Sequence, residues 1–267
     1  INTKDLPKIN ILIGGSPCQS FSFAGKMAGM STKENIEITT LKQYLKLKKE
    51  GFEFNGQSYL FWEYVRILKE VKPKYFLLEN VKMLKKWQDI ISETLGVEPI
   101  LINSALVSAQ NRKRLYWTNI PNIEQPENKG ILLRDILDDG FQPFSEKAYC
   151  LTVSGRDGLT KKGLEHCLKY KKDNFVFIKT IPHGYMKESI DGKEKYPSSC
   201  AQSPASKHLI LDGTVYRKLS SNECEKLQTV PLDYTKGVSD TQRYKMLGNG
   251  WTVDVIAHIF SYLPEEY

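Results

Sequence analysis

The chain has 267 residues, of which 40% are hydrophobic and 26% are charged, so it suits one large or two small globular domains. The formal net charge of +7 is compatible with a polyanionic partner, but a lysine-rich coding bias explains it equally well. No apolar run approaches the roughly 18 residues of a membrane span, no leader opens the chain, and the five cysteines include no CxxC pair. These features argue against a membrane or secreted protein, a zinc site and a disulfide framework, and we expect a cytoplasmic protein.

In the first part of the chain, strand and helix signals alternate. An apolar run that ends in glycines predicts a buried strand over residues 9–15. Apolar residues at steps of three and four predict a helix over 58–73, which Pro73 stops, and a second buried strand follows over 74–81. Between the first strand and this helix, the basic segment 31–57 has the character of an insertion. We expect its lysines to form a solvated face, with a nucleic-acid contact as the alternative.

The next signals complete the first domain. We expect a short helix over 87–95 and two strands over 98–107 and 114–120, which are close enough in the sequence to form a hairpin. The alternation of strands and helices predicts an α/β fold with a doubly wound, mostly parallel sheet. In such sheets, ligands bind beyond the carboxyl ends of the strands.

The character of the sequence then changes. A polar stretch over 120–130, with two prolines and a glycine, predicts a linker. Residues 131–216 are rich in Gly, Ser and Lys and contain short strand-like pieces such as 174–181. We therefore expect a smaller, loop-rich domain over 126–216, which follows a first domain over 1–125.

The last part of the chain, 217–267, returns to helical signals, and we expect it to rejoin the first domain. Ser220 and Glu223 are three residues apart and form the pattern of a capping box, which predicts a helix over 219–228. A final amphipathic helix is expected over 251–264.

Pro17 and Cys18 stand directly after the first predicted strand and its two glycines. Backbone amides at such a turn favour the thiolate form of a cysteine, and the glycines permit a ligand to approach the backbone closely. Glu79 ends the second buried strand, where burial raises the pKa of a carboxyl group. An inert buried cysteine and a salt-bridged strand end are the alternatives. Because both residues follow parallel strands, we expect them at the same edge of the sheet.

Two further patterns suit a ligand. Arg112 and Arg114 are two positions apart, so on a strand they point to the same side, where two guanidiniums suit an anion or a carbonyl-rich base. A solvated charge run is the alternative. The Gly-Asn-Gly turn at 248–250 precedes a predicted helix, whose free amides suit a carboxylate or a phosphate group, although such a turn alone is a weak signal.

Five blocks of sequence together resemble the cytosine-5 DNA methyltransferases. They are "GGSPCQSFS", "LLENV", "QNRKRLYW", "RKLSSNECEKLQTVP" and "LGNGWTVDVI", in that family's order, and with their surroundings they cover most of 9–120 and 215–263. Two helical segments are also similar to the catalytic domain of animal de novo DNA methyltransferases.

The resemblance implies a fold and a set of partners. It implies a Rossmann-like methyltransferase fold with a target recognition domain over 126–216. The implied methyl donor is S-adenosylmethionine, and the implied substrate is double-stranded DNA. A modification system of a bacterium or a phage is the implied setting, with a cognate restriction endonuclease as a candidate partner.

The resemblance also assigns roles to residues. Cys18 is implied to be the nucleophile that adds to carbon 6 of a flipped cytosine. Glu79 is implied to hold the exocyclic amine and ring nitrogen 3 of this base, Arg114 to contact its carbonyl, and Arg112 to support the loop. The residues implied to surround the methyl donor are Pro17, Leu60, Asn249, Gly250 and Trp251.

Part of the family's pattern is missing. The glycine-rich donor-binding block and the acidic residue after the following strand would precede residue 1, so we expect either a fragment of a complete enzyme or a partner segment on a separate polypeptide. Two other functions stay open, a tRNA cytosine-5 methyltransferase on the same scaffold and a non-catalytic DNA-binding accessory subunit. A cysteine hydrolase is a poor alternative, because no histidine is a strong candidate for a general base beside Cys18.

Overall fold

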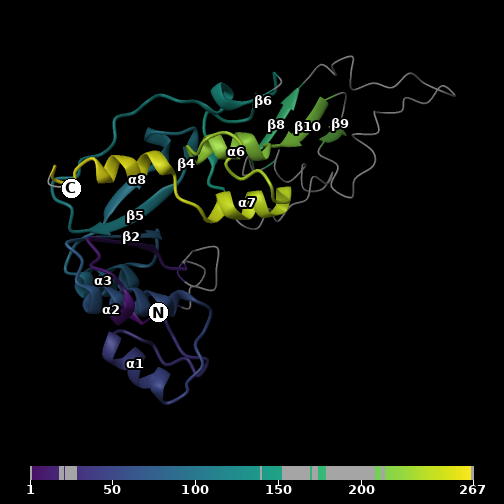
Figure 1. Cartoon of the computed structure of the whole chain (residues 1–267). Helices are drawn as coiled ribbons and strands as arrows, with labels where there is room; N and C mark the ends of the chain where they lie inside the picture. The colour runs from purple at the N-terminus through teal and green to yellow at the C-terminus, as the bar shows by residue number, and fades with distance from the viewer. Residues whose placement is uncertain are drawn as a thin grey trace, which may run out of the picture. The chain divides into compact units, whose positions relative to one another are not determined.

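The computed structural model describes residues 2–17, 21, 29–138, 140–151, 169, 174–178, 208–211 and 214–265. They group into two compact units (Figure 1). Unit 1 comprises Ile1–Asn103, Lys113–Gln125 and Ile259–Tyr267, and unit 2 comprises Ser104–Arg112 and Pro126–His258. The chain changes unit after Gln125, within the expected linker, and residues 217–258 belong to unit 2. The functional division into 1–125, 126–216 and 217–267 stays a prediction.

The sheet of unit 1 is mixed, so the expectation of a mostly parallel sheet is wrong. Strands follow the order β1-β2-β5-β3, in which β1 and β2 run parallel and β5 runs antiparallel to both neighbours. The reason is the hairpin of β3 and β5, because a short connection forces its two strands to run antiparallel. The elements of unit 1 are η1 (Thr3–Asp5), β1 (Ile11–Gly15), α1 (Leu41–Lys49), η2 (Ser58–Leu60), α2 (Phe61–Val71), β2 (Tyr75–Val81), α3 (Lys85–Leu95), β3 (Ile100–Asn103) and β5 (Lys113–Thr118).

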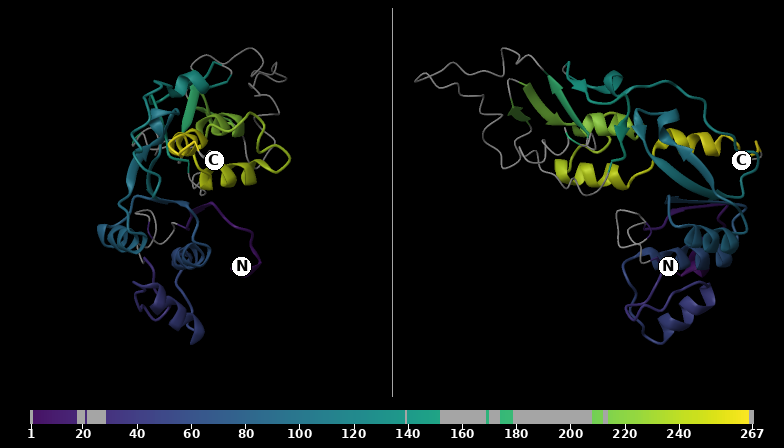
Figure 2. Two further views of the ribbon diagram at one scale, coloured as in Figure 1. Left: turned by 60° about the vertical axis from the view of Figure 1, so that its left-hand side comes forward. Right: turned by 180° about the vertical axis from the view of Figure 1, so that it is seen from behind.

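Helices α2 and α3 lie on the same side of β1 and β2 in every view (Figures 1 and 2). The periodicity of α2 is confirmed, because its buried residues recur along one face, and the helix ends at Lys72, in the left-handed conformation, directly before Pro73. The contact with β1 is close. A Cβ added to Gly14 would lie 2.8 Å from the Cδ2 atom of Tyr64, so this strand position requires glycine.

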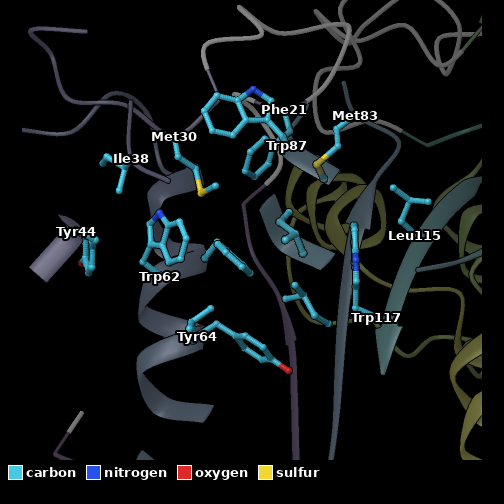
Figure 3. Packing of buried hydrophobic residues seen from close by; sticks show 14 of the residues in the cluster. Phe21, Met30, Ile38, Tyr44, Trp62, Tyr64, Met83, Trp87, Leu115 and Trp117 are labelled. Carbon is cyan, nitrogen blue, oxygen red and sulfur yellow. The ribbon is translucent and has the colours of Figure 1, made fainter. Parts of the chain in front are cut away.

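Aromatic side chains make up much of the core of unit 1 (Figure 3). Trp62 and Trp117 are fully buried, and the ring centre of Phe21 lies 6.2 Å from that of Trp87. Burial of such large rings contributes strongly to the stability of a core. Phe21 therefore fixes the chain on the far side of Cys18, which itself lies outside the described residues.

The segment 31–57 has a buried face as well as the expected solvated one. Thr40 caps α1 by accepting a hydrogen bond from the Gln43 amide, and the lysines of the helix are exposed. Tyr44 and Leu47 face the core, with exposures of 1% and 7%. The segment is therefore packed onto unit 1 in part through one face of α1, while the lysines of this helix stay exposed.

Unit 2 contains a second four-stranded sheet and a two-stranded pair. Strands β6, β8, β10 and β9 form the antiparallel sheet in that order, and β4 pairs with β7 in parallel. Of the strand expected over 174–181, Phe175–Ile178 forms β8 and residues 179–181 lie outside the described residues. The remaining elements are η3 (Ser104–Leu106), β4 (Gln110–Asn111), η4 (Leu133–Ile136), β6 (Gln142–Pro143), β7 (Ala148–Tyr149), β9 (His208–Leu211), β10 (Thr214–Lys218), α6 (Ser221–Leu227), α7 (Asp240–Asn249) and α8 (Val253–Phe260).

The capping box of α6 is confirmed. The Glu223 amide donates to Ser220 Oγ at 3.1 Å, and the Ser220 amide donates to Glu223 Oε2 at 2.7 Å. The last helix is shorter than expected, since α8 ends at Phe260, and α7 was not expected at all. No helix in the described part of the chain is long and apolar enough to span a membrane.

Candidate active site

The first two strands place the candidate nucleophile and acid at one edge of unit 1. Strands β1 and β2 run parallel, and Gly15, the last residue of β1, pairs with Glu79. Cys18 comes three residues after Gly15 in the sequence and lies outside the described residues. The expectation that both segments reach the same edge of the sheet is confirmed for Gly15 and Glu79.

Asn80 holds the backbone that leads from β1 to Cys18. Its Nδ2 atom donates to Ser16 Oγ at 2.9 Å and to the Ser16 carbonyl at 3.3 Å, and the side chain is 1% exposed. Because Asn80 follows Glu79 on β2, the same strand carries the candidate acid and anchors the segment of the candidate nucleophile.

Glu79 is paired with Arg114. The Nε atom of Arg114 lies 2.8 Å from Oε1 of Glu79, and the two side chains are 13% and 11% exposed. Arg114 reaches this position because β5 runs antiparallel to β2 and places it opposite Val81. A neighbouring guanidinium favours an ionised carboxylate, whereas burial disfavours it. The expectation that Glu79 holds a proton near neutral pH therefore stays a prediction.

Arg112 has different partners from Arg114. It is 3% exposed, and its guanidinium donates to the carbonyls of Gly250 at 2.8 Å, Gly248 at 3.1 Å and Leu151 at 3.2 Å. The expectation that the two arginines point to the same side assumed that both lie on a strand, but Arg112 lies between β4 and β5, in unit 2. Its contacts support loops of the backbone instead of facing solvent.

The Gly-Asn-Gly turn ends one helix before the next one begins. Gly248 and Asn249 close α7, and Gly250 is its C-cap, with its amide bonded to the Met246 carbonyl at 2.8 Å. The expected free amides at the start of α8 are not seen at its first two residues. The Val253 amide donates to the Gln228 carbonyl at 3.0 Å, and the Asp254 amide donates to Thr229 Oγ1 at 2.8 Å.

A buried polar network behind this turn escaped the sequence analysis. Gln228 donates to the Leu247 carbonyl at 2.5 Å and accepts a hydrogen bond from Thr252 Oγ1 at 2.9 Å. Gln110 donates to the Leu227 carbonyl at 3.3 Å and accepts from the Leu151 amide at 2.8 Å. No periodicity marks these glutamines, and the one signal for them is that each stands beside a block of apolar or small residues.

A comparison with known protein families identifies the family of this chain. The family model described as "C-5 cytosine-specific DNA methylase" matches residues 1–265. The chain belongs to this family. The family suggested by the five sequence blocks is therefore confirmed, and its members use S-adenosylmethionine as the methyl donor.

Two type II methyltransferases of this family are identical to the chain at 30% or less of the aligned positions. The chain is 30% identical over 290 residues to the type II methyltransferase M1.ScrFI of Lactococcus lactis subsp. cremoris, covering 96% of this chain and 62% of the relative. It is 28% identical over 281 residues to the type II methyltransferase M.SsoII of Shigella sonnei, covering 96% and 64%. The chain thus spans slightly less than two thirds of the length of both relatives. The solved structure of the Entamoeba histolytica methyltransferase EhMeth supports the α/β fold, with a TM-score of 0.52, 17% identity, and coverage of 95% of this chain and 76% of that one.

The residues implied to surround the methyl donor are accessible in each unit. Pro17 and Leu60 are half-buried in unit 1, where Leu60 ends η2 directly before α2. In unit 2, Gly250 and Trp251 are half-buried and Asn249 is exposed. Apolar surfaces and one amide are groups that suit the adenine ring and the polar groups of S-adenosylmethionine, and the role of each residue in binding the donor stays a prediction.

Proposed function

We propose that the chain is the catalytic region of a DNA (cytosine-5)-methyltransferase, which methylates carbon 5 of a cytosine flipped out of a specific duplex sequence. The observation that carries the proposal is the pair of Glu79 and Arg114, 2.8 Å apart on the paired strands β2 and β5, of which β2 lies beside β1, the strand that leads to Cys18. The family match and the two type II relatives support the same reaction.

The chemistry of the pair suits the polar edge of cytosine. This edge presents an amine donor at one end and a carbonyl acceptor at the other. A protonated Glu79 carboxyl group accepts from the amine through its carbonyl oxygen and has an O–H that faces ring nitrogen 3, while the Arg114 guanidinium donates to the carbonyl of the base. Uracil and thymine present a carbonyl in place of the amine and an N–H at ring nitrogen 3, so an acceptor would face the Glu79 carbonyl oxygen and a donor would face its hydroxyl. The pair therefore favours cytosine over these bases.

The thiol of Cys18 supplies the nucleophile. Its thiolate adds to carbon 6 of the base, and the electrons of the ring double bond move toward carbon 5. A proton donated by Glu79 to ring nitrogen 3 would stabilise the charge that develops there. S-adenosylmethionine, when bound, supplies a methyl group on a positively charged sulfur. After carbon 5 has gained the methyl group, loss of its proton and departure of the thiolate restore the double bond.

The base must leave the duplex before it can reach the thiol. Flipping costs roughly a few kcal/mol of unstacking and unpairing. The net charge of +7 supports contacts with phosphates, which offset this cost. The target sequence would be selected by the loop-rich region 126–216.

Covalent trapping tests the proposal. The complete protein is mixed with S-adenosylmethionine and duplex DNA in which 5-fluorocytosine replaces cytosine. Fluorine cannot leave carbon 5 as the proton does, so the adduct persists in SDS. We expect a DNA-linked peptide that contains Cys18 and no adduct from Cys18→Ser. The matched control is Cys224→Ala, which should still form the adduct, because Cys224 is 1% exposed and its burial raises the pKa of the thiol.

Three other results would contradict the proposal in different ways. An adduct with tRNA but not with DNA would favour the tRNA methyltransferase. DNA binding without adduct or methylation of unmethylated plasmid DNA would favour the accessory subunit. An adduct that persists in Cys18→Ser would remove Cys18 from the mechanism.

A further inference from the structure

The Pro17 carbonyl accepts a hydrogen bond from a residue that is distant in the sequence. The Oγ atom of Ser58 donates a hydrogen bond to the Pro17 carbonyl at 3.0 Å, across 41 residues of sequence. The Ser58 side chain is 0% exposed, and Ser58 is the first residue of η2, which leads into α2. The hydroxyl thus joins the segment after β1 to the start of a helix that is packed into the core.

This hydrogen bond matters because its acceptor is part of the peptide bond that leads to Cys18. The Pro17 carbonyl belongs to the planar peptide bond between Pro17 and Cys18. Proline also has a fixed φ angle, so a held carbonyl defines the direction in which the next residue leaves. A hydrogen bond to this oxygen therefore restricts the backbone nitrogen of Cys18 directly.

Two other contacts flank the same short segment. Asn80 holds Ser16 at 2.9 Å, one residue earlier, and Phe21 is 1% exposed in the aromatic core, three residues after Cys18. Of these three contacts of the described residues, the Ser58 bond is the one made to the carbonyl of the Pro17–Cys18 peptide. Loss of the Ser58 hydroxyl would remove this contact and leave the Asn80 and Phe21 contacts in place.

We propose that Ser58 is a positioning residue for the Cys18 nucleophile. Its hydroxyl fixes the Pro17–Cys18 peptide, so that the thiol starts close to the geometry from which it attacks carbon 6. The inference rests on the proposed function of the chain. A displacement of about 1 Å at a reacting atom can slow a reaction by about 100-fold. We expect Ser58→Ala to slow adduct formation by about 10- to 100-fold, without weakening the binding of DNA.

The control is a second buried serine of unit 1. Ser92 is 4% exposed, and its Oγ atom accepts a hydrogen bond from Trp117 Nε1 at 3.0 Å. Ser92→Ala removes the same hydroxyl from the same core but leaves the Pro17 carbonyl untouched. Both variants therefore lose a buried hydroxyl, and Ser58→Ala is the one that releases the Pro17 carbonyl.

The experiment measures two quantities for the complete protein and both variants, at a temperature well below their unfolding midpoints. The first is the single-turnover rate of adduct formation with 5-fluorocytosine DNA and S-adenosylmethionine. The second is the dissociation constant for the same duplex without the donor. We expect only Ser58→Ala to be slow, with dissociation constants within about twofold of each other for all three proteins. If Ser58→Ala does not fold, Ser58→Gly removes the same hydroxyl.

Each other outcome has a defined meaning. Equal rates for the original protein and Ser58→Ala would overturn the inference and leave the proposed function intact. Equal slowing by Ser58→Ala and Ser92→Ala would also overturn it, because the effect would then be a general loss of core structure. Absence of any adduct or methylation by the original protein would overturn the proposed function, and the inference with it.

Discussion

At the edge of unit 1, Arg114 Nε lies 2.8 Å from Glu79 Oε1, and the two side chains retain some exposure. In unit 2, the guanidinium of Arg112 is 3% exposed and donates to three backbone carbonyls and to the sulfur of Cys150. Both arginines belong to one short motif, but Arg114 lies at a partly exposed strand end and Arg112 is buried. The first region holds its charged pair at a partly exposed strand end, and the second buries its guanidinium inside the protein.

The first region therefore suits the recognition of a ligand, and the second suits the support of loops. A charged pair that a ligand can reach can exchange its partner for the ligand, as a base-binding site requires. A buried guanidinium that donates to three backbone carbonyls fixes loops, and its loss leaves several acceptors unsatisfied. Substitutions in the first region should therefore change chemistry more than stability, and substitutions in the second should do the reverse.

The largest effect is expected from Glu79→Gln. The amide keeps the shape of the side chain but cannot take up or deliver a proton, and general acid catalysis is typically worth about 10²- to 10⁴-fold. We expect adduct formation with 5-fluorocytosine DNA to slow by at least about 100-fold. The loss of unfolding free energy should be smaller than that caused by Arg112→Ala.

The comparison for this variant is Glu53→Gln. The Glu53 side chain is 68% exposed and pairs with Lys33 at the surface, so its replacement should leave the rate unchanged. A Glu79→Gln variant as fast as Glu53→Gln would remove Glu79 from the chemistry.

The next effect is expected from Arg112→Ala, in the second region. Removal of the guanidinium leaves the carbonyls of Leu151, Gly248 and Gly250 without this donor. Each buried unsatisfied polar group costs about 1–3 kcal/mol, so we expect a loss of about 3 kcal/mol in unfolding free energy. Denaturant unfolding followed by circular dichroism measures this loss.

Arg134→Ala is the matched change at an exposed site, where the Arg134 side chain is 70% exposed. It should alter the unfolding free energy by less than about 0.5 kcal/mol. Equal stability of the two variants would mean that the contacts of Arg112 do not hold unit 2 together, and the contrast between the two regions would fail.

The fold could be predicted where the signal is local. The run before Gly15, the steps of three and four in α2, and the capping box of α6 each lie within one element, and each was predicted correctly. The mixed direction of the strands was missed because β5 lies between β2 and β3. This position is set by tertiary contacts, which the local sequence pattern does not show. Helix α7 was missed because its buried residues are only Leu247 and Gly248, although Ser239 caps it by accepting from the Gln242 amide.

The candidate site could be predicted in part for a similar reason. Strand ends can be located from sequence, so the meeting of the segments that carry Glu79 and Cys18 was foreseeable. The two arginines were misjudged because strand alternation was applied to Arg112, which lies outside a strand. The glutamine network behind the turn was missed because its members come from four separate segments and follow no period.

The smallest expected effect is a change in stability at acidic pH. It tests whether the two units lose stability separately as the pH falls. Burial alone would raise the pKa of Glu63, but hydrogen bonds from Lys48, Tyr44 and Arg66 outweigh it and lower this pKa to about 2. In unit 2, burial likewise raises the pKa of Glu225, and bonds from Thr235 and Arg243 outweigh it and lower the pKa below its ordinary value.

A carboxyl group whose pKa is lowered by folding stabilises the protein fully above its unfolded value, which is 4.5 for Glu63. This stabilisation is lost as the pH falls from about 4.5 toward 2, because the folded state must then accept the proton. Glu63→Gln should therefore lower the unfolding midpoint of unit 1 at neutral pH and flatten its dependence on pH below about 4.5. Glu225→Gln should do the same for unit 2 alone. In thermal unfolding between about pH 6 and pH 2, tryptophan fluorescence in a Trp251→Phe background reports on unit 1 through Trp62, Trp87 and Trp117. Circular dichroism of the same samples follows the whole chain, including unit 2. If Glu63→Gln left the acid slope of unit 1 unchanged, the bonds that attach α1 to α2 through Glu63 would not hold in solution.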